Sequence, residues 1–452
     1  MMNSVSTLLS DYIQIDTSTS NGNEKKGLLY LQSLAKSFGL YTFYHETTST
    51  KGNLIISIRE EDIQPFNDEV YDINRMHQGT RFSKPPTVLL SHVDVVDAEV
   101  EDWTHHPFLG AIVDGEIWGR GAIDAKQIGI THLLTMKNLK DMKLKQPLIQ
   151  IITSEEESGS ENGLKRMLSD YPFLWNNATV WNEGGGFLIE IEGKLFYLVE
   201  TGQKGNMSFT VQLSPKKSIN PYLPSNEVDL LTFLLIDSFK NLQIPNEVLP
   251  LSVVQMLTLI AKELRIDFSS HNYESIIKNI PTKYNRMFSA MVRSTFTLTK
   301  ISGGRRNIET KGQYKISFDA RPLPGTQTST LINLVQETIK NIDPTAVIEW
   351  IITNGGYDQG ISEEMRVRLE ECLKLSGVNA CVVPFMTIGS NDGRYFQPFN
   401  ATVLGYCPMT PEITFDQIIK RVHGVNERIS VKDLEFGIDQ LTKVLEKTLK
   451  VY

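Results

Sequence analysis

The sequence has few cysteines and no long hydrophobic run. Its 452 residues include only Cys372, Cys381 and Cys407, without CxxC spacing, so neither a disulfide framework nor a thiolate metal site is indicated. No stretch approaches the roughly 20 apolar residues that a membrane-spanning helix needs, and the N-terminus lacks the basic and apolar regions of a secretory signal. We therefore expect a cytoplasmic protein without a membrane partner.

An excess of positive charge is also absent. The chain has 45 lysines and arginines against 53 aspartates and glutamates, which gives a formal net charge of -8. This balance argues against a nucleic acid or an anionic membrane as a partner. The length exceeds the roughly 250–300 residues at which a single hydrophobic core stops growing, so we expect two domains.

Apolar strands alternate with helical patterns on both sides of a central segment. The strands are expected at 54–58, 87–96, 148–152, 178–181 and 380–384, and the helices at 4–16, 24–38, 128–139, 162–169, 361–375 and 431–449. Buried strands that alternate with helices are typical of an α/β core with a mainly parallel sheet flanked by helices. Residues 61–84 are polar and rich in turn formers, which predicts an exposed insertion.

The central segment has a different pattern. Residues 207–213 alternate apolar and polar side chains, like a strand with one face in water. Further elements are expected there, with strands at 294–299, 314–320 and 346–352 and helices at 226–241, 251–264 and 328–341. We therefore predict an inserted α+β domain over 205–353, which splits the core domain into residues 1–204 and 354–452.

His92 and Asp94 stand two residues apart in an apolar run. Side chains of a strand alternate between its faces, so we expect both on one face. A neutral imidazole binds a metal ion through one nitrogen, and a carboxylate on the other nitrogen fixes its tautomer. The spacing predicts a metal ligand with its supporting carboxylate, with a structural hydrogen bond as the alternative.

Further donor side chains stand at the ends of predicted strands or in turns, where ligands collect in open α/β sheets. They are Asp124 after Gly119-Arg120-Gly121, the run Glu155-Glu156-Glu157, Glu183 before three glycines, and His423 ahead of the last helix. Singly, each has a structural explanation as a solvated side chain or a helix cap. Together they indicate a metal site, and oxygen and nitrogen donors without cysteine suit zinc or another first-row divalent ion.

The order of these motifs resembles that of one metallopeptidase family. HxDVV, GRGxxDxK, EExG, NEGG and HGxNE follow one another as in the family of carboxypeptidase G, bacterial dipeptidases, carnosinases, aminoacylases and succinyl-diaminopimelate desuccinylase. The resemblance covers nearly the whole chain, because the core motifs bracket the segment where this family carries a lid. It implies a zinc-peptidase-like core with a lid domain over 205–353. Many relatives dimerise through the lid, so a homodimer is one expectation.

The resemblance also implies a site for two divalent metal ions. Zinc is the expected metal, with cobalt and manganese as alternatives. Each ion receives one imidazole, one terminal carboxylate and one oxygen of a shared carboxylate, and ions bridged in this way lie about 3.5–4 Å apart. The implied ligands are His92 and Glu183 for one ion, Glu157 and His423 for the other, and Asp124 as the bridge.

Other residues match the family's catalytic and substrate-binding positions. Glu156 matches the general base, which takes a proton from water and passes it to the leaving amine, and Asp94 matches the carboxylate that orients His92. In the inserted domain, Arg321 resembles the arginine that holds a substrate carboxylate, with a salt bridge at a strand end as the alternative. Asn307 resembles a lid asparagine that contacts the substrate.

The implied activity is hydrolysis of an amide bond next to a free carboxylate. A dipeptidase or carboxypeptidase-like enzyme acting on small peptides is our leading hypothesis. An N-acyl-amino-acid deacylase would differ only in the shape of its pocket, so both stay open at this point.

One departure from the family leaves a third alternative. Relatives carry a lid histidine that donates to the reaction's oxyanion, and residues 213–221 contain none. Loss of one such donor typically costs about 10²–10³ in rate. Either Lys216 or Lys217 replaces it, or His271 arrives from elsewhere, or the chain is a catalytically weak metal-binding homologue.

Overall fold

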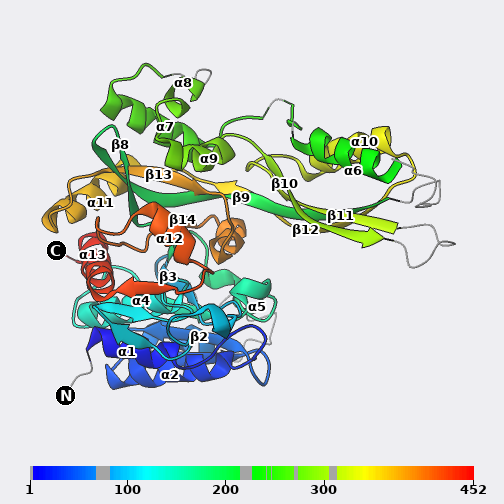
Figure 1. Cartoon of the computed structure of the whole chain (residues 1–452). Coiled ribbons are helices and arrows are strands. Elements are labelled where there is room, and N and C mark those ends of the chain that lie inside the picture. Colours follow the sequence, from blue (N-terminus) through cyan, green and yellow to red (C-terminus); the bar gives the residue numbers. More distant parts are fainter. Residues whose placement is uncertain are drawn as a thin grey trace. The chain divides into compact units, whose positions relative to one another are not determined.

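The computed structural model describes residues 4–67, 82–213, 227–240, 242–245, 247–268, 273–304 and 313–451. The chain forms two compact units (Figure 1). The first consists of Met1–Thr201, Ile361–Phe385 and Asn391–Tyr452, and the second of Gly202–Gly360 and Met386–Ser390. The predicted polar insertion over 61–84 lies largely outside the described residues.

The first unit is built on a mixed sheet with a parallel centre. From one edge inward its strands are β1 (Tyr41–Glu46), β2 (Gly52–Ser57), β6 (Leu148–Thr153), β3 (Thr87–His92), β7 (Thr179–Asn182) and β14 (Thr402–Gly405). The neighbours β6, β3, β7 and β14 run parallel to one another, whereas β1 and β2 are antiparallel to their partners. The predicted α/β core with a mainly parallel sheet is confirmed.

Helices cover this sheet because its central strands are apolar on both faces. Every residue of β2, β3 and β6 is buried, as expected for strands between two helical layers. The α-helices described in this unit are α1 (Val5–Ile13), α2 (Glu24–Ser37), α3 (Gln64–Asn67), α4 (Lys126–Leu139), α5 (Leu164–Asp170), α11 (Glu363–Leu375), α12 (Phe415–Arg421) and α13 (Val431–Leu449). Helix α4 packs on β3 and β6, and α2 packs on β1 and β2.

Strand β3 is shorter than the predicted strand over 87–96. It ends at His92, and the chain then leaves the sheet, because Val95 pairs with the segment around Ser18. The Val95 amide donates to the Thr17 carbonyl at 3.2 Å. The expectation that His92 and Asp94 share one face of one strand was therefore wrong, although the two residues remain in contact.

A small second sheet brings two distant loops together. Its strands are β4 (Ala111–Val113), β5 (Glu116–Trp118) and β15 (Arg428–Ser430), with β5 in the middle. Because β5 and β15 are antiparallel, the loop that follows Trp118 lies beside the loop that precedes Arg428. These are the loops of Asp124 and His423.

A buried ion pair joins these loops. Arg120 Nη1 lies 2.7 Å from Glu427 Oε2, and both side chains are almost fully buried. The Glu427 carboxylate also accepts from the amides of Gly121, Ile123 and Asp124 at 3.1, 2.7 and 3.0 Å. Arg120 Nη2 donates to the His423 carbonyl at 3.2 Å. Glu427 therefore fixes the backbone from which Asp124 projects.

The second unit is an α+β structure with an antiparallel sheet. Its strand order is β10 (Thr295–Gly304), β11 (Gln313–Arg321), β9 (Lys194–Leu213) and β12 (Val347–Asp358), where β9 enters from the first unit. Residues of helices α6 (Glu227–Lys240) and α10 (Thr328–Ile342) share a hydrophobic core with one face of this sheet. Three further helices precede β10: α7 (Leu251–Leu264), α8 (Tyr273–Ile277) and α9 (Thr282–Met291).

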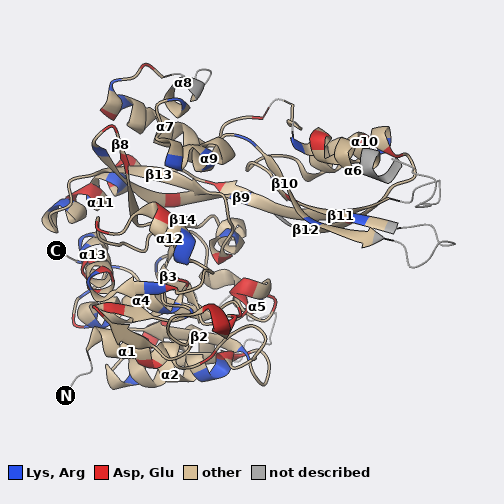
Figure 2. Ribbon diagram, viewed as in Figure 1, with Lys and Arg blue, Asp and Glu red and all other residues tan. Residues whose placement is uncertain are grey.

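The remaining strands are β8 (Phe187–Ile191), which forms a hairpin with β9, and β13 (Cys381–Thr387). Charged residues of both signs are interspersed along the described elements (Figure 2). Among the described helices, none is long and apolar enough to cross a membrane.

The ion pair of Arg120 and Glu427 predicts a large loss of stability on substitution. Glu427→Ala leaves a buried guanidinium without its partner, which should lower the free energy of unfolding by about 3–5 kcal/mol. Chemical denaturation measures the change. Glu435→Ala, an exposed site on α13, is the matched control and should change stability by less than about 0.5 kcal/mol. Equal effects of the two substitutions would contradict the assigned role of Glu427.

Candidate metal centre

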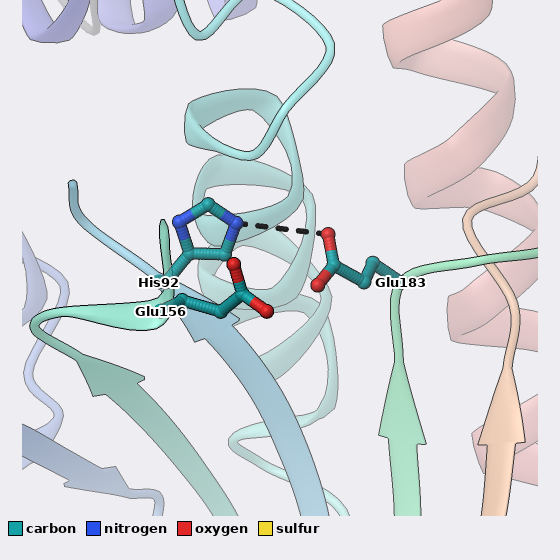
Figure 3. A group of neighbouring side chains, drawn as sticks. All are labelled: His92, Glu156 and Glu183. Atoms are coloured by element: carbon teal, nitrogen blue, oxygen red, sulfur yellow. Dashed lines mark ion pairs between the residues drawn. The ribbon is translucent and has the colours of Figure 1, made fainter. Parts of the chain in front are cut away.

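The predicted ligands gather at the carboxyl ends of the parallel strands of the first unit. His92 is the last residue of β3, and Glu183 follows the last residue of β7. Glu156 and Glu157 lie in the turn after β6. Figure 3 shows the carboxylates of Glu156 and Glu183 directed toward the His92 ring. This edge is where ligands bind in open α/β sheets.

Asp124 lies between two imidazoles. Its Oδ1 is 3.0 Å from His92 Nε2, and its Oδ2 is 3.0 Å from His423 Nε2. His423 Nε2 is also 2.9 Å from Glu157 Oε1, while His92 Nε2 is 3.6 Å from Glu183 Oε2. One carboxylate thus faces two groups, each made of one imidazole and one further carboxylate.

Ligand atoms in this cluster are close enough to share an ion. In each of two triads, His92 with Glu156 and Glu183 and His92 with Asp124 and Glu157, one donor atom per residue lies within 4.8 Å of the others. Imidazole nitrogens and carboxylate oxygens are donors that zinc and other first-row divalent ions accept. The residues therefore fit a metal centre.

The electrostatics of the cluster reflect crowded, buried charges. Burial and, after it, the nearby charge of Asp124 together raise the pKa of Glu183 to about 7. Burial and the charge of Glu183 hold the pKa of Glu156 well above its usual range. Hydrogen bonds to Asp124 and Glu157 raise the pKa of His423 to about 10. Like charges in a buried site are costly, so the cluster favours cations, whether protons or metal ions.

Asp94 contacts the site in two ways. His92 Nδ1 lies 2.9 Å from the Asp94 backbone carbonyl and 3.5 Å from its carboxylate, so the carbonyl is the nearer acceptor. The carboxylate instead accepts from the amides of Glu156 and Glu157 at 3.1 and 3.0 Å. Asp94 therefore holds both the imidazole and the turn that carries two glutamates.

The structure adds positioning residues that the sequence did not single out. Arg120 and Glu427 stand inside the motifs GRGxxDxK and HGxNE, so the motifs contained the signal, but nothing in the local sequence shows that the two side chains pair.

The glycine after Glu183 lies close to a buried carboxylate, that of Glu200. Asn391 Nδ2 donates to this carboxylate at 3.0 and 3.2 Å. A Cβ added to Gly184 would lie 1.8 Å from Glu200 Oε2. The glycine after Glu183 is therefore required for this close approach.

The loop after β13 also reaches the site. Ser160 Oγ lies 2.5 Å from Asp392 Oδ1, and the charge of Asp392 contributes to the raised pKa of Glu156. Arg394 follows two residues later, with its guanidinium 4.6 Å from the Tyr395 ring centre. Its Nε and Nη1 are buried and have no hydrogen-bond partner among the described residues.

The two predicted substrate-binding residues, Arg321 and Asn307, fall in the sequence range of the second unit. Arg321 belongs to the second unit, where its Nε and Nη2 donate to the two carboxylate oxygens of Asp319 at 2.7 and 3.0 Å. The salt bridge at a strand end, named above as the alternative, is thus present. Asn307 and the three residues considered as oxyanion donors, Lys216, Lys217 and His271, lie outside the described residues.

Several known proteins are similar to this chain in sequence or in fold. The model of peptidase family M20/M25/M40 matches residues 88–447. The mouse (Mus musculus) N-fatty-acyl-amino acid synthase/hydrolase PM20D1 is 22% identical over 377 residues, which cover 79% of this chain and 73% of the relative.

Two solved structures share the fold at low sequence identity. The M20 family metallo-carboxypeptidase Sso-CP2 of Sulfolobus solfataricus has a TM-score of 0.69 at 16% identity, with 98% of this chain and 99% of that chain covered. The YXEP protein of Bacillus subtilis, a dinuclear metal-binding peptidase of the M20 family, has a TM-score of 0.59 at 10% identity, covering 98% and 97%.

The family match spans well over half of the chain and includes all the motifs, so the resemblance inferred from the motif order is confirmed. The chain belongs to peptidase family M20/M25/M40 and is an enzyme that hydrolyses amide bonds.

Proposed function

We propose that this protein is a dinuclear-metal hydrolase that cleaves an amide bond next to a free carboxylate, with small peptides as substrates. The observation that carries the proposal is the Asp124 carboxylate, whose two oxygens face His92 and His423 separately. We propose zinc as the metal, with cobalt or manganese accepted by the same donors. Location in the cytoplasm and dimerisation through the second unit remain predictions.

The proposed ligands are His92 and Glu183 for one ion, Glu157 and His423 for the other, and Asp124 for both. Two ions held in this way would lower the pKa of a shared water and polarise the substrate carbonyl. Asp94 keeps His92 in place, since its carbonyl accepts from Nδ1 and leaves Nε2 directed at Asp124. The chain itself thus fixes the tautomer of this ligand.

Glu156 is the proposed general base. Its carboxylate lies beside His92 and Glu183 (Figure 3), and its pKa is raised by burial and by Glu183. A raised pKa brings a carboxylate closer to the range in which it can accept a proton from water and return it to the leaving amine. Its neighbour Glu157 pairs with His423 and also lies near His92 together with Asp124, so the two glutamates share His92 but differ in their other partners.

The substrate carboxylate needs a cationic partner, and we propose Arg394 for this role. Two of its guanidinium nitrogens have no hydrogen-bond partner among the described residues, and it lies in the loop that also carries Asp392. Arg321 is the second candidate, but a carboxylate that binds there would have to replace Asp319. An arginine fork suits a carboxylate because both groups are planar and pair in a bidentate manner.

A second candidate function is hydrolysis of N-acyl-amino acids. The similarity to mouse PM20D1, an N-fatty-acyl-amino acid synthase/hydrolase, supports it. Peptides and N-acyl-amino acids both place a carboxylate next to the scissile amide, so the same metal centre would serve either. Retention of all five proposed ligands and the base argues against the catalytically weak homologue.

Glu156→Gln should abolish turnover while both metal ions stay bound, because the amide keeps the size of the side chain but cannot accept the proton. Hydrolysis of a panel of dipeptides and N-acyl-amino acids, with metal content measured by mass spectrometry, tests this. Glu161→Gln, at an exposed residue of the same segment, is the control and should keep full activity. Wild-type turnover by Glu156→Gln would show that the base is wrongly assigned.

Metal removal should stop hydrolysis, and zinc, cobalt or manganese should restore it. The pKa of His423 is raised to about 10, so this imidazole holds its proton at neutral pH, and a metal ion must displace it. Metal affinity should therefore rise by up to about tenfold per pH unit for each proton displaced. Titrations of the wild type with metal ion near pH 6 and pH 8 measure the change. The same titrations are made with His423→Gln, which has no imidazole proton to lose at this position. His106→Gln, at an exposed histidine, is the control for that substitution. An affinity independent of pH would contradict this account.

Arg394→Gln should raise KM for substrates with a free carboxylate by about 10- to 100-fold, since charged hydrogen bonds contribute about 1.5–3 kcal/mol. Residual hydrolysis of the same substrates with an amidated carboxylate should not change. Arg321→Gln tests the second candidate in parallel, and Arg286→Gln, at an exposed position of α9, is the control. If Arg394→Gln weakened both kinds of substrate equally, Arg394 would not be the carboxylate partner.

A further inference from the structure

The turn that carries Glu156 and Glu157 begins with a residue in a left-handed conformation. Glu155 has φ 64° and ψ 22°, a conformation that is unfavourable for a residue other than glycine and persists only where the surroundings impose it. Its carbonyl accepts from the amides of Ser158, Gly159 and Ser160 at 3.2, 2.9 and 2.6 Å. Three amides of the turn therefore share the Glu155 carbonyl as their acceptor.

The Glu155 side chain is held from two directions. Lys51 Nζ lies 2.6 Å from its Oε1. From the other direction, the Asn162 amide donates to Oε2 at 2.6 Å, and Asn162 Nδ2 donates at 3.0 and 3.2 Å. The side chain of Glu155 is only 11% exposed and that of Lys51 22% exposed, so water screens this pair less than a surface ion pair.

Lys51 lies in the connection between β1 and β2, and this connection contacts both ends of the turn. The Gly52 amide donates to Ser154 Oγ at 3.3 Å, and Thr47 Oγ1 donates to the Asn162 carbonyl at 2.7 Å. Lys51 Nζ is also 3.4 Å from the buried carboxylate of Glu24. Thr47 and Lys51 of this connection, together with Gly52 at the start of β2, thus contact the segment 154–162 at three points.

We propose that Lys51 is a positioning residue for the hydrolytic reaction. It fixes the Glu155 carboxylate, which holds the start of the turn in its left-handed conformation, while Asp94 fixes the next two amides. Together these contacts keep the adjacent side chains of Glu156 and Glu157 at their different partners. The inference rests on the proposed function, because Glu156 matters only if it acts as the base.

Lys51→Met tests the proposal, because methionine keeps an aliphatic stem of similar length and removes the charge and its hydrogen bonds. We expect kcat to fall about 10- to 100-fold, as when a catalytic group is displaced by about 1 Å, with KM changed less than about twofold. Lys51→Arg retains the donors and should restore most of kcat. Lys25→Met is the matched control, since Lys25 pairs with Glu46 of β1 and not with the turn; it should keep wild-type kcat.

A double-mutant cycle tests whether Lys51 acts through Glu155. Glu155→Gln alone should lower kcat. The double variant with Lys51→Met should lower kcat by much less than the product of the two single effects, because both substitutions break the same contact. Independent, multiplicative effects would overturn the proposal. So would a wild-type kcat for Lys51→Met.

Hydrogen exchange provides a readout that does not depend on activity. In Lys51→Met the amides of residues 156–160 should exchange faster, while those of β3 and β6 stay protected as in the wild type. Unchanged exchange in the turn, or faster exchange throughout the sheet, would overturn the positioning role. If the wild-type protein hydrolysed no amide, the proposed function would fail, but the exchange result would still decide whether Lys51 holds the turn.

Discussion

The contact of one carboxylate with two imidazoles is the constraint on which this site depends. Asp124 can face His92 and His423 only if two loops that are some 300 residues apart in sequence lie side by side. The antiparallel pair of β5 and β15 brings these loops together, and the buried pair of Arg120 and Glu427 fixes them. The candidate metal centre thus depends on a strand pair and on a buried ion pair whose residues are not themselves proposed ligands.

The second requirement is that two neighbouring glutamates face different partners. Glu156 lies near His92 and Glu183, whereas Glu157 lies near His92 and Asp124 and pairs with His423. Side chains of adjacent residues diverge reliably only when the backbone between them is fixed. Here Asp94 binds both amides, and Glu155 adopts a left-handed conformation before them. Concentrated acidic charge is expensive to bury, and the raised pKa values of Glu156 and Glu183 reflect this cost, which bound cations would offset.

Much of the fold could be predicted because the apolar periodicity and the turn-forming residues of the sequence mark the same element boundaries. Strands such as β6, buried at every residue, and α7 and α13 were predicted with nearly their observed bounds. The short strands β4, β5 and β15 were missed, since three residues carry no usable periodicity. Of the site, the motifs predicted the residues that the structure brings together as candidate ligands. They did not predict the bend after His92 or the contacts of Glu427 and Lys51, which join residues distant in sequence.

If Asp124 bridges two metal ions, anomalous X-ray diffraction from crystals of the zinc-loaded protein should show two peaks about 3.5–4 Å apart. One oxygen of Asp124 should lie on each ion, with His92 on one ion and His423 on the other. A single peak, or two peaks without Asp124 between them, would contradict this bridging role.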